Sequence, residues 1–582
     1  MARQLERFDN LVSMFLTRAG ENGDKPFLSA KRDGQWRATS WSEAARQVAA
    51  LAESLTRIGL EPGDRVMLVS ENRPEWLIAD LGIMAAGCVT VPTYTTNTTR
   101  DHTHILGDSG AKAVIVSNPK LAKSLIPAVL FSAGCHHVIG IEPIRTGQAT
   151  DDFHYHHWDE LVAGEPDMGA LRQRLERLGR DDLACIIYTS GTGGAPRGVQ
   201  QHHGAILHNI AGCVDVISKD FGWDEELFLS FLPASHAYEH TGGQHFPVGL
   251  GAQIYYAESL EKLSANIDEV RPTIMVVVPR LFEMLRARII KGVAKGGLSG
   301  YLLKRALSIG ADRYEGRFKP WDLPMAGLLS LTLRRKVRKR FGGRVKAMVS
   351  GGAPLNPEVG LFFDSLGLII LQGYGQTESG PVISCNRPSA GVRMDTVGPP
   401  LINTEVRIAE DGEIMVRGEN VMHGYWRNPE ETARVLQDGW LATGDVGHLD
   451  AKGRIVITDR KKDLIVNDKG DNVAPQRVEG MLTLQPEIAQ AMVYGDRRPY
   501  LVALLVPDPE IAGAADAEQR LKAAVDRVNG EISVVEKVRR FIIADEPFSI
   551  DNEQLTPSMK VRRHVLKDAY GARLDALYKK AS

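Results

Sequence analysis

Short apolar runs, rich in valine and isoleucine, recur along the chain and alternate with longer segments of helical pattern. The runs span residues 65–70, 113–117, 183–188, 273–278 and 346–350. Apolar strands that alternate with helices are typical of parallel sheets covered by helices. After the first run, residues 71–87 show a helical pattern with Pro74 near its start and Gly87 past its end. The pattern therefore predicts layered, parallel α/β structure.

The sequence changes character at about residue 405, where short β segments separated by turn residues begin. Asp411 and Gly412 lie between two such runs and indicate a β-hairpin. After Asp459, about 120 residues contain strands and helices of their own, which is enough for a small domain. We predict an α/β fold: a large N-terminal region of α/β layers, 1–459, with a small β subdomain at about 405–459, followed by a small mobile α+β C-terminal domain, 460–582.

Charge and composition narrow the function. Lys and Arg number 70 against 72 Asp and Glu, and the resulting net charge of −2 gives no general attraction to nucleic acid, so we predict no such partner. The five cysteines are scattered without a CxxC pair, which favours neither a disulfide framework nor a zinc site. No apolar run approaches the ~18 residues of a membrane span, and the N-terminus is charged. These features predict a cytoplasmic protein.

Two further segments have unusual composition. Residues 334–340 contain six basic residues, which we interpret as a solvated helix face or as a contact with an anionic membrane surface or coenzyme A phosphates. Residues 154–158, HYHHW, contain three histidines but no Cys or acidic ligand at helical spacing. We expect an exposed loop there rather than a metal site.

The segment 188–199, YTSGTGGAPRGV, follows a strand-like apolar run and is rich in glycine, serine and threonine. Glycines let the backbone approach an anion, while hydroxyl and backbone N–H groups donate to it. Arg197 adds a positive charge. No Gly-Lys-Ser/Thr follows, so the triphosphatase loop motif is absent. The segment predicts a phosphate-binding loop, and a flexible solvated loop is the alternative.

Other segments suit the rest of a nucleotide. Residues 371–380, LQGYGQTESG, follow an apolar run and bring an aromatic ring, a hydroxyl and a carboxylate together; a turn with a capping glutamate is the alternative. Residues 350–355, SGGAPL, place paired glycines where the backbone could lie against a flat base or an acyl chain. In residues 439–447, GWLATGDVG, the Asp445 carboxylate could accept hydrogen bonds from a diol or cap a turn.

These segments resemble motifs of the adenylate-forming superfamily, which includes acyl-CoA synthetases, luciferases and peptide-synthetase adenylation domains. The loop 188–199 is similar to the form YTSGTTGxPKGV, with Gly193 in place of Thr and Arg197 in place of Lys. Arginine keeps the charge but presents a planar fork, so the departures bear on how pyrophosphate is held. Residues 371–380 resemble the GYGxTE element, and residues 439–447 resemble WxxTGD.

The resemblance implies a role for each matching residue. Tyr374 would stack on adenine, Thr377 would contact the α-phosphate, and Glu378 would bind Mg²⁺. Asp445 and Arg460 would contact the ribose. The nucleotide-binding set is Thr189, Ser190, Gly191, Thr192, Gly193, Gly194, Arg197, Gly352, Ala353, Pro354, Tyr374, Gly375, Asp445 and Arg460.

Two further segments complete the resemblance. Residues 231–243, FLPASHAYEHTGG, resemble an acyl-CoA synthetase element in which His236 lines the acyl or pantetheine passage; His240 replaces the usual arginine, which leaves the ion pair of Glu239 open. Residues 555–563, LTPSMKVRR, resemble the segment with the catalytic lysine, here Lys560. The family rotates its C-terminal domain about the position of Lys462, which withdraws Lys560 and brings in the loop around Gly470.

Within the superfamily, the chain resembles bacterial long-chain fatty-acid–CoA ligases. This resemblance implies ATP-dependent ligation of a medium- or long-chain fatty acid to coenzyme A through an acyl-AMP intermediate, with ATP, Mg²⁺ and coenzyme A required. The alternatives are an acyl-AMP ligase that delivers to a carrier protein and a non-catalytic nucleotide- and acyl-binding protein. A cytoplasmic location, with peripheral contact at the inner membrane face through residues 334–340, is expected, and no oligomeric state is predicted.

Overall fold

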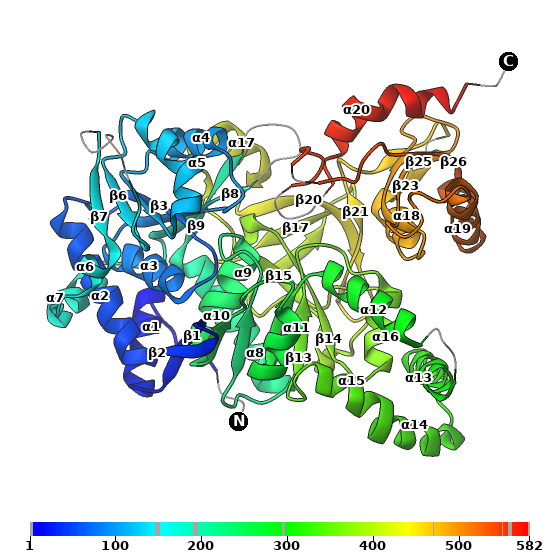
Figure 1. The fold of residues 1–582 in the computed structure, drawn as a ribbon, viewed down its shortest axis with the longest axis horizontal. Coiled ribbons are helices and arrows are strands. Elements are labelled where there is room, and N and C mark those ends of the chain that lie inside the picture. The colour runs from blue at the N-terminus through cyan, green and yellow to red at the C-terminus, as the bar shows by residue number, and fades with distance from the viewer. Residues whose placement is uncertain are drawn as a thin grey trace.

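A computed structural model describes residues 4–145, 152–189, 196–293, 297–469, 471–549, 551–556 and 561–579. Within these residues, two eight-stranded sheets form the large N-terminal region (Figure 1). One has the strand order β15-β14-β13-β12-β10-β11-β1-β2, and the other β18-β9-β8-β4-β3-β5-β6-β7. The central strands of both sheets pair in parallel, as the sequence predicted.

The strands of the first sheet are β1 (Pro26–Arg32), β2 (Gln35–Ser40), β10 (Leu227–Ser230), β11 (Gln253–Tyr256), β12 (Ile274–Val277), β13 (Ala347–Ser350), β14 (Ile370–Gly375) and β15 (Val382–Cys385). Those of the second are β3 (Arg65–Val69), β4 (Val89–Thr93), β5 (Ala113–Val116), β6 (His137–Gly140), β7 (His154–His157), β8 (Leu183–Thr189), β9 (Arg197–His202) and β18 (Gly424–Tyr425). All five apolar runs singled out in the sequence form strands: β3, β5, β8, β12 and β13.

Helices cover the sheets and fill the space between them. Those of the first 293 residues are α1 (Leu11–Asn22), α2 (Trp41–Arg57), α3 (Pro74–Ala85), α4 (Thr99–Ser109), α5 (Pro119–Leu130), α6 (Trp158–Val162), α7 (Met168–Leu175), α8 (His203–Asp220), α9 (Ala237–Glu239), the π-helix η2 (His240–His245), α10 (Phe246–Leu250), α11 (Leu263–Val270) and α12 (Pro279–Val293). Those that follow, up to residue 379, are α13 (Leu298–Tyr314), η3 (Pro320–Asp322), α14 (Leu323–Leu329), η4 (Ser330–Arg334), α15 (Arg335–Arg340), α16 (Pro357–Ser365) and η5 (Thr377–Ser379).

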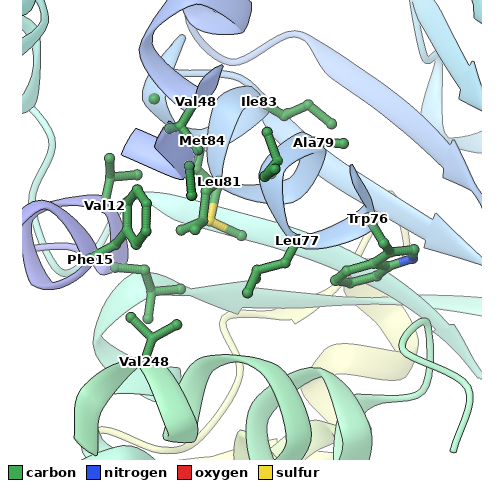
Figure 2. Packing of buried hydrophobic residues seen from close by; sticks show 14 of the residues in the cluster. Val12, Phe15, Val48, Trp76, Leu77, Ala79, Leu81, Ile83, Met84 and Val248 are labelled. Atoms are coloured by element: carbon green, nitrogen blue, oxygen red, sulfur yellow. The ribbon is translucent and has the colours of Figure 1, made fainter. Parts of the chain in front are cut away.

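Helix α3 shows why the prediction from local pattern succeeds. It begins at Pro74, whose ring fits the first helical turn, and ends before Gly87, as predicted. All its residues are buried, and Trp76 and Leu77 pack in a cluster with Phe15 of α1 and Val248 of α10 (Figure 2). The same cluster includes side chains from strands of both sheets, so α3 lies in the core that joins them.

A five-stranded β unit follows, built from β16 (Glu405–Ile408), β17 (Glu413–Arg417), β19 (Leu436–Gln437), β20 (Trp440–Leu449) and β21 (Ile455–Arg460), with α17 (Pro429–Val435) beside it. The hairpin predicted at Asp411-Gly412 is confirmed, because β16 and β17 pair antiparallel across it. The last part of the chain contains β22 (Ile465–Val466), β23 (Asn472–Val473), α18 (Pro475–Thr483), β24 (Ile488–Tyr494), β25 (Leu501–Pro507), α19 (Ala517–Glu531), β26 (Val538–Ile543) and α20 (Arg563–Ala576).

The expectation of an exposed loop at the histidine-rich segment is wrong. His154–His157 form β7, the edge strand of the second sheet, which pairs in parallel with β6. Backbone hydrogen bonds to a strand that precedes it in the chain fix this segment, and Tyr155 and His156 are half-buried. The polar residues of this segment gave no local signal for a strand, because the strand is held by pairing with β6, earlier in the chain.

No helix among the described residues is long and apolar enough to cross a membrane. Residues 334–340 are helical, at the end of η4 and through α15, a conformation that fits both interpretations of the basic segment.

Candidate active site

The predicted phosphate loop joins β8 to β9. These strands pair antiparallel, and Thr189 lies directly opposite Arg197 in the register. The hairpin therefore holds both ends of the loop in fixed positions on a rigid sheet. Five of the predicted loop residues lie outside the described residues: Ser190, Gly191, Thr192, Gly193 and Gly194.

Arg197 is anchored on one side of this loop. Its guanidinium forms an ion pair with Glu431 of α17 and lies 4.6 Å from the ring centroid of Tyr425. Glu431 also pairs with Arg434; the hydrogen bond from Arg434 and the charge of Arg197 lower the pKa of Glu431 and outweigh its burial, which raises it. The Arg197 side chain retains partial exposure, so a phosphate could compete with Glu431 for it.

Tyr425 links the phosphate-loop hairpin to the predicted Mg²⁺ ligand. Strand β18, which carries Tyr425, pairs with β9, and the Tyr425 hydroxyl donates a 2.8 Å hydrogen bond to Oε1 of Glu378. Burial and the neighbouring Glu378 raise the pKa of Tyr425, so it remains a hydroxyl donor. The Gln201 side-chain amide of β9 donates to the Thr377 carbonyl, which fixes the segment that carries Glu378.

A second polar group lies where β14 meets β20 and β21. The Tyr374 hydroxyl donates a 2.7 Å hydrogen bond to Oδ2 of Asp445, and Nε of Arg460 lies 3.2 Å from Oδ1. Asp445 and Arg460 are direct partners in the pairing of β20 with β21. Arg460 is also close enough to Glu378 for the two charges to interact, which joins this group to the first.

Two glycines of this region occupy positions where another residue would clash or strain the backbone. A Cβ at Gly375 would clash with the Pro381 carbonyl oxygen across the β14–β15 pair. Gly352 has a φ of +80°, in the left-handed region that favours glycine. Ala353 and Pro354 follow it and are exposed, at the end of β13.

The half-buried His236 lies beside the ring of Tyr94 and the backbone of Tyr238. Its Nδ1 accepts a 3.2 Å hydrogen bond from the backbone N–H of Tyr238, and its ring centroid is 6.5 Å from that of Tyr94. The Tyr238 hydroxyl donates to the Val349 carbonyl at 2.9 Å, so its ring lies beneath the glycines that follow β13. The segment with His236 is thereby tied to the predicted nucleotide-binding loop at Gly352.

His240, which stands where an arginine is usual, lies beside the buried carboxylate of Asp80. Nε2 of His240 and Nε2 of His245 lie 3.1 and 2.8 Å from Oδ2 of Asp80, and all three side chains are fully buried. The π-helix places the two histidines on one side because its turn is wider than an α-turn. Burial opposes ionisation of Asp80, but His240 and His245 outweigh it and lower its pKa.

Glu239 makes no ion pair among the described residues. Its Oε1 accepts hydrogen bonds from Ser230 Oγ at 2.6 Å and from Gln244 at 3.4 Å. Burial raises the pKa of Glu239 to about 8. The carboxyl is therefore neutral at neutral pH.

The predicted hinge follows β21. Lys461, next to Lys462, pairs with Asp411 and Glu413 of the β unit, at 2.8 Å for Glu413. On the other side, Arg563 at the start of α20 makes a two-armed ion pair with the buried Glu479 of α18, at 2.7 and 2.6 Å. Gly470 and Lys560 lie outside the described residues.

Comparison with known proteins decides the family. Residues 15–426 match the family described as "AMP-binding enzyme", and residues 462–582 match "AMP-binding enzyme C-terminal domain". The chain belongs to the AMP-binding enzyme family. This confirms the adenylate-forming resemblance and the α/β fold with a small C-terminal part.

Among related AMP-binding enzymes, the long-chain-fatty-acid–CoA ligase FadD15 of Mycobacterium tuberculosis is 33% identical, over 98% of this chain and 97% of the relative. A long-chain-fatty-acid–[acyl-carrier-protein] ligase, AEE15, of Arabidopsis thaliana is 29% identical, over 93% of this chain and 82% of the relative. The A domain of carboxylic acid reductase from Segniliparus rugosus, solved with AMP and a co-purified carboxylic acid, superposes with a TM-score of 0.79 at 22% identity, over 99% of this chain and 95% of that one.

Motif matching missed the residues that support the predicted site in this AMP-binding enzyme: Gln201, Tyr238, Tyr425 and Glu431. Each acts through a partner far away in sequence; Arg197 and Glu431 are 234 positions apart. One signal was available, since Tyr238 lies two residues after His236 in a segment already singled out.

The residues present fit Mg²⁺. The cation prefers oxygen ligands, and Glu378 offers a half-buried carboxylate beside the phosphate-loop hairpin, with one oxygen oriented by Tyr425. When bound with ATP, Mg²⁺ would reduce the repulsion between the phosphate oxygens and an incoming carboxylate.

Proposed function

We propose that this AMP-binding enzyme ligates a medium- or long-chain fatty acid to coenzyme A through an acyl-AMP intermediate, releasing AMP and pyrophosphate. The observation that supports it most is the joined polar network. Residues from separate segments, Arg197, Glu378 and Asp445, connect through Tyr425 and Arg460 into one group suited to phosphate, metal and ribose. The similarity to FadD15 over nearly the whole of both chains supports the fatty-acid substrate and the coenzyme A acceptor.

In the first step, the fatty-acid carboxylate would attack the α-phosphorus and displace pyrophosphate. Thr377 would contact the α-phosphate, and Lys560 would offset the charge that develops on the phosphate oxygens, a role that is typically worth ~10²–10³ in rate. In the second step, the coenzyme A thiol would attack the acyl-AMP, with AMP as leaving group.

Two reactions in one site require a rearrangement. We propose that residues 460–582 form a mobile domain that turns about Lys462 relative to residues 1–459, withdrawing Lys560 and bringing the Gly470 loop to the coenzyme A side. His236 would line the acyl or pantetheine passage, because Tyr238, two residues further on, lies beneath the loop that follows β13.

A second acceptor has support of its own. The similarity to AEE15, named a ligase of long-chain fatty acids to acyl carrier protein, extends over 93% of this chain. Purified protein given ATP, Mg²⁺ and palmitate should form palmitoyl-CoA with coenzyme A, measured by mass spectrometry. Product only with phosphopantetheinylated carrier protein would favour the second acceptor, and no AMP release from any acid would favour a non-catalytic binding protein.

A further inference from the structure

Large apolar side chains are exposed together on one part of the surface. Residues 297–340, here called the helical arm, comprise α13, η3, α14, η4 and α15. Within it, six large apolar side chains are between 47% and 73% exposed: Leu298, Tyr301, Trp321, Leu323, Leu328 and Leu331. Soluble proteins rarely expose apolar side chains in such a group without a binding role.

The arm is a folded structure with an inner and an outer side. Ala326, Leu329 and Val337 are buried in the cluster that also holds side chains of α13 and α16. Trp321, Leu328 and Leu331 lie on the consecutive helical segments η3, α14 and η4, and their side chains are 72%, 47% and 72% exposed. Figure 1 shows α13 and α14 at the edge of the molecule, away from α18, α19 and α20.

Positive charge surrounds these side chains. The helical arm contains eleven cationic residues against three acidic ones, Asp312, Glu315 and Asp322; Arg317 pairs with Asp312 and Glu315, and Arg305 pairs with Asp322. Arg334 and Arg338 donate hydrogen bonds to the carbonyls of Ser365 and Gly367, and Arg338 remains exposed.

The other cations of α15 face outward. Within the part of the chain that the structure describes, Arg335, Lys336, Lys339 and Arg340 are exposed and form no ion pair with a carboxylate. They are free to bind an external anion. Since the whole chain has a net charge of only −2, this attraction is local to the arm and acts over about a Debye length, ~10 Å.

We propose that the helical arm docks this protein on the surface of an anionic phospholipid bilayer. Trp321, Leu328 and Leu331 would enter the headgroup region, while Arg335, Lys336 and Lys339 bind lipid phosphates. An apolar face flanked by cations is the pattern of helices that lie in a membrane interface. Free phosphate or a nucleotide would use the cations but would leave the exposed tryptophan and leucines in water.

The proposal does not depend on the acyl-CoA ligase assignment, and its test needs no turnover. Purified full-length protein is sedimented with vesicles of phosphatidylcholine alone or of phosphatidylcholine mixed with phosphatidylglycerol. We expect binding to the mixed vesicles that weakens as salt is added, because screening shortens the reach of exposed charges. Quenching of tryptophan fluorescence by lipids with a quencher near the headgroup should decrease in Trp321→Phe.

Two variants separate the apolar and charged parts. Trp321→Ser combined with Leu331→Ser should abolish most of the binding. Arg335→Gln combined with Lys336→Gln should weaken it by about fivefold for each cation removed. The matched controls lie on α5 and its end: Phe131→Ser, an 80% exposed ring, and Lys120→Gln combined with Lys123→Gln. Both controls should bind vesicles like the wild type.

Thermal unfolding midpoints show that the variants fold. Equal binding to neutral and anionic vesicles, equal binding by arm and control variants, or no binding to either vesicle would each overturn the proposal. Light scattering tests the alternative that the arm binds a second copy of the chain. A dimer that Trp321→Ser converts to monomer, without vesicle binding, would assign the arm to self-association instead.

Discussion

The phenolic oxygen of Tyr425 lies 2.8 Å from Oε1 of Glu378, to which it donates a hydrogen bond. The two residues come from separate segments, and the ring of Tyr425 also lies under the guanidinium of Arg197. One side chain thus contacts both the predicted Mg²⁺ ligand and the cation of the predicted phosphate loop. This arrangement makes Tyr425 a positioning residue whose role can be measured.

Replacing Tyr425 with Phe keeps the ring under Arg197 but removes the hydrogen bond to Glu378. Because a hydrogen bond to a charged group is worth about 1.5–3 kcal/mol, we expect pyrophosphate release to slow by roughly tenfold to a hundredfold. The Mg²⁺ concentration for half-maximal rate should rise as well. Tyr301→Phe, an exposed tyrosine elsewhere, is the control; a Tyr425→Phe enzyme with unchanged Mg²⁺ dependence would remove Tyr425 from the metal site.

The ion pair between Arg197 and Glu431 predicts opposite effects at its two ends. Arg197→Ala should raise the KM for ATP more than that for the fatty acid, and Arg197→Lys should stay active because the charge remains. Glu431→Gln should lower the KM for ATP, since the arginine is then released to phosphate. Initial-rate kinetics with ATP varied provide the measurement. If Arg197→Ala leaves the ATP kinetics unchanged, the cation does not reach the nucleotide.

The two lysines of the C-terminal part should divide the half-reactions. Lys560→Ala should abolish acyl-AMP formation from ATP but still convert supplied acyl-AMP and coenzyme A to thioester. Lys462→Pro should do the reverse, because a fixed φ at the pivot hinders rotation. Single-turnover assays of each half-reaction test both variants. Equal loss of both half-reactions in both variants would contradict alternation of the domain.

The buried Glu239 predicts a pH dependence of stability. Because its pKa rises from 4.5 to about 8 on folding, the folded protein holds this proton more tightly than the unfolded chain. Protonated Glu239 therefore stabilises the folded protein fully below about pH 4.5. This stabilisation is lost as the pH rises to about 8, by at most about 1.4 kcal/mol for each pH unit.

Glu239→Gln should remove this dependence, because an amide does not titrate. Relative to wild type, the variant should gain stability as the pH rises from about 5 to about 8, as measured by chemical denaturation. The exposed Glu410→Gln serves as control and should follow the wild type. A constant difference between Glu239→Gln and wild type across this range would show that Glu239 is ionised in the folded protein.

Much of the fold could be predicted from the sequence because its signals are local. The apolar run of β8, the hairpin at Asp411-Gly412 and the helix from Pro74 depend on neighbouring residues, and all three form as predicted. The predicted site residues could be named because their motifs are short and continuous. Their roles remain predictions, and the structure adds how the described ones connect.

The sequence by itself determined the layered α/β plan, the family and which short segments carry polar chemistry. Only the tertiary structure decided that His154–His157 form an edge strand, that His240 faces Asp80, and that Arg197 pairs with Glu431. The reason is physical. In a mostly parallel sheet, strands that lie side by side are separated by long crossovers, so a side chain's partner is set by strand order and not by sequence neighbours.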